Sequence, residues 1–172
     1  QSGGFIDAAP DETASATAGQ SLTVTLEDDI DVSRGDVITA AGHRPIVADR
    51  LYARVFWMGT AALVPGRSYL LRLGTSSAKA TAEPAPQILD LDSRTSTIAD
   101  EIRTNEIGQC VLRLDRLIAV ARYAENKDLG SFILVDPETH DTVAMGCIEQ
   151  AGSEDGRLGR MRRTLIGQWR RL

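Results

Sequence analysis

The residues best suited to metal binding or nucleophilic catalysis are two histidines and two cysteines. His43 and His140 have no cysteine, second histidine or carboxylate at the spacing of a zinc site. Cys110 and Cys147 lie in alternating apolar runs without a CxxC pair, so we expect both thiols to pack in a core. A reactive thiol would need a lowered pKa and a neighbouring base. The sequence therefore predicts no metal site and no catalytic residue.

Two segments can be compared with nucleotide-binding motifs. A phosphate loop needs a glycine-rich run that ends in lysine and then serine or threonine, and the sequence contains none. The triplet 126–128 is close to the guanine-reading NKxD motif, but its aspartate comes one place early and Leu129 holds the required position. We interpret this triplet as a solvated turn and predict no bound cofactor in this chain.

Composition limits the classes of protein to consider. The chain has 172 residues, of which 42% are hydrophobic and 25% charged, enough for one globular domain or two small ones. A formal net charge of −5 argues against a general nucleic-acid binder. No apolar run reaches the ~20 residues that span a bilayer, and no signal peptide is recognisable. We expect a cytoplasmic protein without membrane contact. The missing initiator methionine leads us to expect a fragment of a longer protein.

The dominant pattern is the period-two alternation of antiparallel strands. In 20–27, three aliphatic residues share one face. In 50–59 both faces are fairly apolar, which predicts a strand covered on both sides. Pro65-Gly66 and Pro137-Glu138 supply turns. Further strand-like runs follow at 68–78, 79–92, 108–119, 130–136 and 140–148. Short strands separated by turns predict an antiparallel barrel or sandwich.

Helical patterns are confined to two places. Residues 97–103 could form one helical turn. The tail from Gly156 to Leu172 places apolar residues, Trp169 among them, on one helical face and arginines on the other. From Ser153 onward there are six arginines and two carboxylates, a local charge of +4, which leaves −9 on the rest of the chain. A basic helix beside an acidic body suggests docking on this chain or on a partner, and the alternatives are a disordered tail or binding to a membrane surface or nucleic acid.

Several ordered phrases of the sequence resemble the large, GTPase subunit of bacterial sulfate adenylyltransferase (ATP sulfurylase), a relative of elongation factor Tu. The match covers roughly Ala18 to Ile148. It departs from the family pattern at Leu117 and Arg122, where prolines are usual, and across Pro84 to Ser96. The phrases that carry it are AGQSLTVTLEDDIDVSRGDVI (18–38), FWMG (56–59), LVPGRSYLLRLGT (63–75), NEIG (105–108), YAEN (123–126) and GSFILVDPETHDTV (130–143).

The resemblance implies an all-β fold in three parts. Residues 1–45 would be the C-terminal strands of an incomplete barrel like the second domain of elongation factor Tu. Residues 46–150 would form an antiparallel Greek-key β-barrel like the third domain of that protein. Residues 151–172 would be a basic tail with a short C-terminal helix.

The resemblance also implies a function. In that family GTP hydrolysis drives the formation of adenylylsulfate from ATP and sulfate, while adenylyl transfer takes place in a small partner subunit. This chain would then be an inactive part of a nucleotidyltransferase in sulfate assimilation, serving as a scaffold. Its partners would be the small catalytic subunit and the GTPase domain, which would hold GTP and magnesium.

Contact residues and alternatives complete the prediction. We expect the loop with Tyr123, Glu125, Asn126 and Lys127, together with Trp169, to contact a partner. One alternative is the tRNA- or RNA-binding barrel of a translational GTPase, which the acidic composition and the lack of a basic and aromatic strand face disfavour. A second alternative is a piece of a bifunctional protein that also carries an adenylylsulfate kinase.

Overall fold

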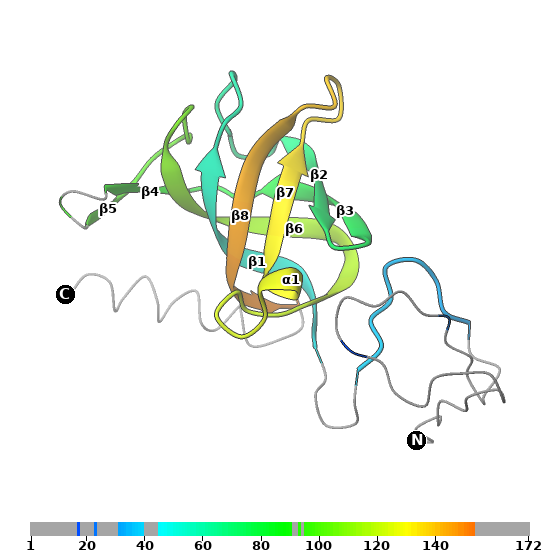
Figure 1. Ribbon diagram of the computed structural model, residues 1–172. Helices are drawn as coiled ribbons and strands as arrows, with labels where there is room; N and C mark the ends of the chain where they lie inside the picture. Colours follow the sequence, from blue (N-terminus) through cyan, green and yellow to red (C-terminus); the bar gives the residue numbers. More distant parts are fainter. Residues whose placement is uncertain are drawn as a thin grey trace, which may run out of the picture.

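A closed barrel of six antiparallel strands forms the centre of the molecule (Figure 1). The computed structural model describes residues 17, 23, 31–39, 45–90, 93 and 95–153. The barrel strands are β1 (Ile46–Trp57), β2 (Ser68–Leu73), β3 (Ser76–Ala82), β6 (Ile107–Val120), β7 (Ser131–Val135) and β8 (Thr142–Gly152). The predicted all-β class and the antiparallel barrel are therefore confirmed.

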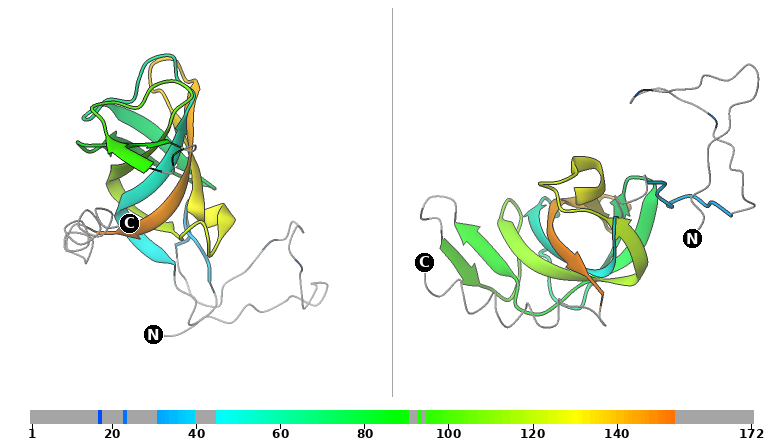
Figure 2. Two further views of the ribbon diagram at one scale, coloured as in Figure 1. Left: turned by 90° about the vertical axis from the view of Figure 1, so that its left-hand side faces the viewer. Right: turned by 90° about the horizontal axis from the view of Figure 1, so that it is seen from below.

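The barrel closes because β1 pairs with two neighbours. Its residues are in antiparallel register with β6 on one side and β8 on the other. The remaining pairings run β8-β7-β2-β3-β6, so the ladder returns to β1. The connections from β1 to β2 and from β6 to β7 join strands that are not neighbours, which is the Greek-key arrangement. The right-hand view of Figure 2 looks into one end of this ring.

Alternation along the strands sorts residues between the interior and the outer face. On β1, Leu51, Val55 and Trp57 are buried in the core, whereas Arg54 is exposed and Phe56 only partly covered. The prediction that both faces of this strand are covered is therefore wrong, because a closed six-stranded barrel has only one interior. Trp57 is 1% exposed and belongs to the core. Its ring meets Tyr69 edge-on, with centroids 5.3 Å apart, and its indole N–H donates to the Ala61 carbonyl oxygen at 2.8 Å.

Phe132 fills space that a side chain at Gly146 would occupy. The two residues are directly opposite each other on β7 and β8. A Cβ built on Gly146 would overlap the Phe132 ring, which is buried in the core. Glycine on one strand thus makes room for an aromatic ring on the next, a cross-strand pairing that fixes the register of β7 against β8.

A two-stranded hairpin extends from β6 outside the barrel (Figure 1). Its strands are β4 (Gln87–Asp90), which pairs with β6, and β5 (Thr95–Ile98), which pairs with β4. The predicted helical turn at 97–103 is wrong. Thr95–Ile98 is a strand, and the buried Ile102 exchanges two main-chain hydrogen bonds with Leu63. The long-range Leu63–Ile102 bridge, which the local sequence does not reveal, holds this segment extended.

The loop between β6 and β7 folds back on the barrel and contains the helix α1 (Lys127–Gly130). Asn126 caps this helix, because its side-chain oxygen accepts hydrogen bonds from the main-chain N–H groups of Asp128 and Leu129, at 2.9 and 3.0 Å. The Tyr123 N–H donates to the Ile148 carbonyl oxygen at 2.9 Å and so ties the loop to β8. The loop predicted here is confirmed, with one helical turn that the sequence pattern did not predict.

Two parts of the prediction fall mostly outside the described residues. Only residues 17, 23, 31–39 and 45 of the predicted incomplete second barrel are described. Within them, the turn at Gly35 contacts the β2–β3 hairpin, because the Ser76 hydroxyl donates to the Gly35 carbonyl oxygen at 2.9 Å. The predicted C-terminal helix, with Trp169, lies outside the described residues, so the three-part division stays a prediction. None of the helices in the described ranges is both long enough and apolar enough to span a membrane.

We predict that Gly130→Ala destabilises the chain by about 1–3 kcal/mol, the usual range for overpacking. A Cβ at Gly130 would overlap the main-chain nitrogen and Cα of Tyr123, and main-chain atoms cannot move aside as a side-chain tip can. Urea denaturation followed by tryptophan fluorescence measures the change. Ala124→Ser, at an exposed position of the same loop, is the control and should change stability by less than about 0.5 kcal/mol. An unchanged midpoint for Gly130→Ala would contradict this packing.

The hydrogen bonds of Asp136 make its contribution to the stability of the fold depend on pH. Its carboxylate accepts hydrogen bonds from the main-chain N–H groups of Glu138 (2.8 Å) and Thr139 (3.3 Å) and from the Arg67 guanidinium (2.7 Å). The Glu138 N–H above all, and then the other two donors, lower the pKa of Asp136 below its ordinary value, while burial opposes them. A lowered folded-state pKa stabilises the fold above the unfolded pKa of about 3.9, and the benefit is lost as the pH falls through the folded-state value.

We therefore expect Asp136→Asn to lower the melting temperature at pH 7, and the deficit to shrink as the pH is lowered from about 4 toward 2. Thermal unfolding by circular dichroism across this range measures it. Asp100→Asn, at an exposed position, is the control and should follow the wild-type curve at every pH. A deficit of constant size between pH 7 and pH 2 would show that the carboxylate charge is not responsible.

Candidate functional site

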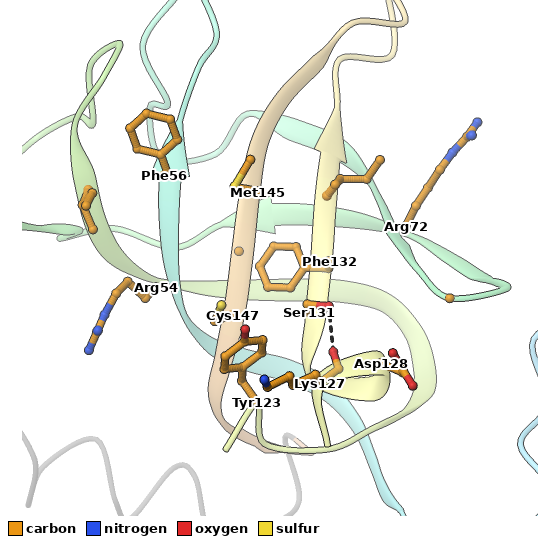
Figure 3. Close-up of a pocket in the computed structure, with 14 residues that line it drawn as sticks. Arg54, Phe56, Arg72, Tyr123, Lys127, Asp128, Ser131, Phe132, Met145 and Cys147 are labelled. Carbon is orange, nitrogen blue, oxygen red and sulfur yellow. Dashed lines mark hydrogen bonds between the residues drawn. The ribbon is translucent and has the colours of Figure 1, made fainter. Parts of the chain in front are cut away.

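A groove lies on the outer face of the barrel, where β1, β8 and β7 run side by side above the α1 loop (Figure 3). Its volume is about 760 Å³. Phe56 and Met145 lie toward one end, and Tyr123 and Lys127 lie at the other (Figure 3). The groove therefore joins the outer face of the barrel to the loop predicted as a contact surface.

The register of four strands builds an apolar row across the groove. Ile107 on β6 is opposite Phe56 on β1, Phe56 is opposite Met145 on β8, and Met145 is opposite Ile133 on β7. Directly opposite side chains on antiparallel strands contact one another, so these four form one continuous surface. Met145 is 52% exposed, although methionine is usually buried. Arg72 on β2, opposite Ile133, ends the row.

A polar network fixes the outer face next to this row. The Arg54 guanidinium pairs with the Glu149 carboxylate at 2.5 Å, and the Gln109 amide N–H donates to the same carboxylate at 2.8 Å. The Tyr52 hydroxyl donates to the Gln109 side-chain oxygen at 3.2 Å. Burial, and then the negative charge of Glu149, raise the pKa of Tyr52, so its hydroxyl keeps its proton for this hydrogen bond. In this network the negative charge of Glu149 balances the positive charge of Arg54.

Two other cations of the groove have no such compensation within the described residues. Arg72 and Lys127 are both exposed, and neither side chain has an ion pair with another residue in the described ranges. Asp128 is the one carboxylate among the described lining residues. The charged groups that line the groove are thus mainly basic, in contrast with the −9 carried by the chain outside its tail.

The structure places the five predicted contact residues in different settings. Tyr123, which is 39% exposed, and Lys127 both line the groove. Asn126 uses its side-chain oxygen to cap α1, and Glu125 is an exposed residue whose carboxylate lies 3.7 Å from the Arg122 guanidinium. Trp169 is outside the described residues. Of the four that lie in the described residues, two therefore line the groove, and whether any of the five contacts a partner stays a prediction.

The cysteines differ from each other. Cys110 is buried, as predicted, and burial raises the pKa of its thiol to about 12, so it stays protonated. The prediction that Cys147 packs in the core is wrong. It is opposite Arg54 on one side and Ser131 on the other, faces outward, and lines the groove. Val143 and Ala144 are both buried although they are consecutive in β8, and from there on Gly146 and Ile148 are buried while Met145 and Cys147 are not. The sequence pattern did not reveal this break in the alternation.

Comparison with known proteins identifies the family. Residues 50–149 match the family described as GTP-eEF1A C-terminal domain-like. "Bifunctional enzyme CysN/CysC" of Xylella fastidiosa is 43% identical over 80% of this chain and 22% of its own length. "Sulfate adenylyltransferase subunit 1" of Methylorubrum extorquens is 40% identical over 78% of this chain and 29% of its own length. "Bifunctional enzyme NodQ" of Rhizobium meliloti is 38% identical over 80% and 22%. The chain thus spans less than a third of these relatives.

Solved structures share the fold at lower sequence identity. A crystal structure of sup35 complexed with GDP superposes with a TM-score of 0.73 at 19% identity, covering 86% of this chain and 37% of sup35. Translation elongation factor SelB from Methanococcus maripaludis gives 0.58 at 15% identity, covering 77% and 29%. With the match at 50–149 and this barrel, the chain belongs to the GTP-eEF1A C-terminal domain-like family, and its relatives there include sulfate adenylyltransferase subunit 1.

Proposed function

We propose that this chain is the barrel portion of a sulfate adenylyltransferase subunit 1, and that it acts as a scaffold. In this role it joins the GTPase domain, which holds GTP and magnesium, to the small subunit that carries out adenylyl transfer. The observation that carries the proposal is the 40% identity to sulfate adenylyltransferase subunit 1 over 78% of the chain. Relatives named as bifunctional enzymes match a similar share of the chain, 80%, so the scaffold role suits both kinds of parent protein.

The site chemistry supports binding as the role of this region. The groove has apolar side chains and two cations without an ion pair in the described residues, and a hydrogen-bonded network lies beside it; these are the components of a protein contact surface. Of the two thiols, Cys110 is held protonated in the core. Within the described ranges, no three histidine, cysteine or acidic side chains gather as a metal site.

The proposed function first predicts binding to the partner subunit. The full chain of 172 residues should bind a small catalytic subunit of bacterial sulfate adenylyltransferase and elute with it from a size-exclusion column at about 50 µM of each protein, well above a micromolar dissociation constant. The sup35 C-terminal region, which shares the fold at 19% identity, is the matched control and should elute separately. Separate elution of this chain and the small subunit would contradict the scaffold role.

The second prediction concerns the nucleotide. Isothermal titration of the chain with GTP and magnesium should give no saturable binding with a dissociation constant below about 1 mM. The physical reason is that the sequence lacks the phosphate loop, whose main-chain N–H groups and lysine hold the phosphates. A full-length sulfate adenylyltransferase subunit 1 serves as the positive control. Saturable binding of GTP to this chain would place a nucleotide site in it and contradict the assignment of GTP to another domain.

A further inference from the structure

We propose that the outer groove binds a polypeptide segment of the partner that is both apolar and acidic. Phe56 and Met145 supply the apolar floor, and Arg72 and Lys127 receive carboxylates of the segment. The inference rests on the proposed function, because that function supplies the partner. It goes further by naming the surface and the chemistry of the segment that occupies it.

The apolar part of the argument comes from strand register. Phe56, Met145 and Ile133 are consecutive neighbours across β1, β8 and β7, and their side chains point away from the barrel core. Met145 is 52% exposed at the centre of this row, and methionine adapts its shape to a partner surface. Tyr123, at the lower end of the groove, adds an aromatic ring that is 39% exposed (Figure 3). A continuous apolar row with an exposed methionine at its centre and partly exposed neighbours is typical of a protein contact.

The acidic part of the argument comes from charge complementarity. Arg54 is compensated by Glu149, so it has little charge left for a partner. Arg72 and Lys127 have no such pairing within the described residues, and both line the groove. Carboxylates on the bound segment would supply the missing opposite charge, whereas Asp128 at the groove edge would repel a segment that carried carboxylates at that point. The preferred segment therefore has one acidic residue opposite Arg72 and another opposite Lys127 on its Tyr123 side, away from Asp128 (Figure 3).

The same charges argue against two other occupants. The chain's own tail from Ser153 to Leu172 carries a net charge of +4 and would bring arginines toward Arg72 and Lys127. RNA would favour a track of cations with aromatic rings that stack on bases. The groove has a row of apolar side chains that ends at Arg72, with Lys127 apart from it beside Tyr123, on a body with a charge of −9, so its cations do not form a continuous track. An acidic and apolar protein segment fits both features.

A hydrogen-bond network holds the outer face of the barrel beside the groove floor. Gln109, which is 4% exposed, links the Tyr52 hydroxyl to the Glu149 carboxylate, and Glu149 in turn holds Arg54. These three hydrogen bonds join β1, β6 and β8 beside the apolar row. A surface that is fixed in advance loses less side-chain freedom when a partner binds, which favours affinity.

The test compares groove variants with matched variants elsewhere on the full chain. Fluorescence anisotropy measures the affinity for a labelled small catalytic subunit. The double variant Arg72→Glu with Lys127→Glu should weaken binding about tenfold or more, and Met145→Gln about threefold or more. Arg116→Glu and Leu117→Gln are the controls. Arg116 is an exposed cation, Leu117 is 55% exposed and so resembles Met145 at 52%, and neither Arg116 nor Leu117 lines the groove. Both controls should stay within about twofold of wild type. Circular dichroism verifies that each variant is folded.

Equal binding by the groove variants and wild type, or an equal loss in the controls, would overturn the proposal. A second probe separates this result from failure of the proposed function. A synthetic peptide of alternating glutamate and leucine should bind the wild-type chain and shift the Met145 methyl signal in nuclear magnetic resonance spectra, and a lysine and leucine peptide should not. If the small subunit does not bind but the acidic peptide does, the proposed function fails and the groove specificity stands. If neither binds, or if tRNA displaces the peptide at physiological salt, the groove proposal fails.

Discussion

The closing of the barrel on β1 is the constraint on which the other features depend. One strand of 12 residues pairs with β6 on one side and β8 on the other, so the first and last strands of the barrel are neighbours. A closed ring has one interior, which six strands fill with side chains such as Leu51, Leu112 and Leu134. Every second residue must then face outward, whether it is polar or not. The apolar row of the groove is a direct result of that geometry.

The sequence predicted the strands well because alternation and turn residues are local signals. Pro65-Gly66 and Pro137-Glu138 lie in turns, and the runs around Trp57 and Leu134 are strands. The predicted runs 68–78 and 79–92 are wrong in their bounds, because the turn at Gly74 separates β2 from β3, and 79–92 contains the end of β3 and all of β4. The other errors share one physical cause, which is that burial depends on residues far away in the sequence. The segment 97–103 is extended because Ile102 pairs with Leu63. The outward faces of Phe56 and Cys147 could not be assigned until the closure of the barrel was known.

The candidate site was only partly predictable for the same reason. The loop with Tyr123 and Lys127 was visible as a polar break between two strands, whereas Arg72, Phe56 and Met145 lie on separate strands that only the register brings together. The apolar residues on the outer face of 51–58 could have indicated a contact surface. A second layer of protein covering that face explained them equally well. Asn126 illustrates the opposite case, because a polar residue in an exposed loop has a structural task as a helix cap.

The hairpin of β4 and β5 has a consequence for sequence divergence. Its root is fixed where Gly108 fits tightly against Ile102 and the Gln87 carbonyl oxygen, but β5 pairs with β4 alone in the described part of the chain. Because the barrel closes without this hairpin, substitutions in it leave the ring of hydrogen bonds intact. The hairpin is the place where this barrel can acquire new sequence at the lowest cost in stability.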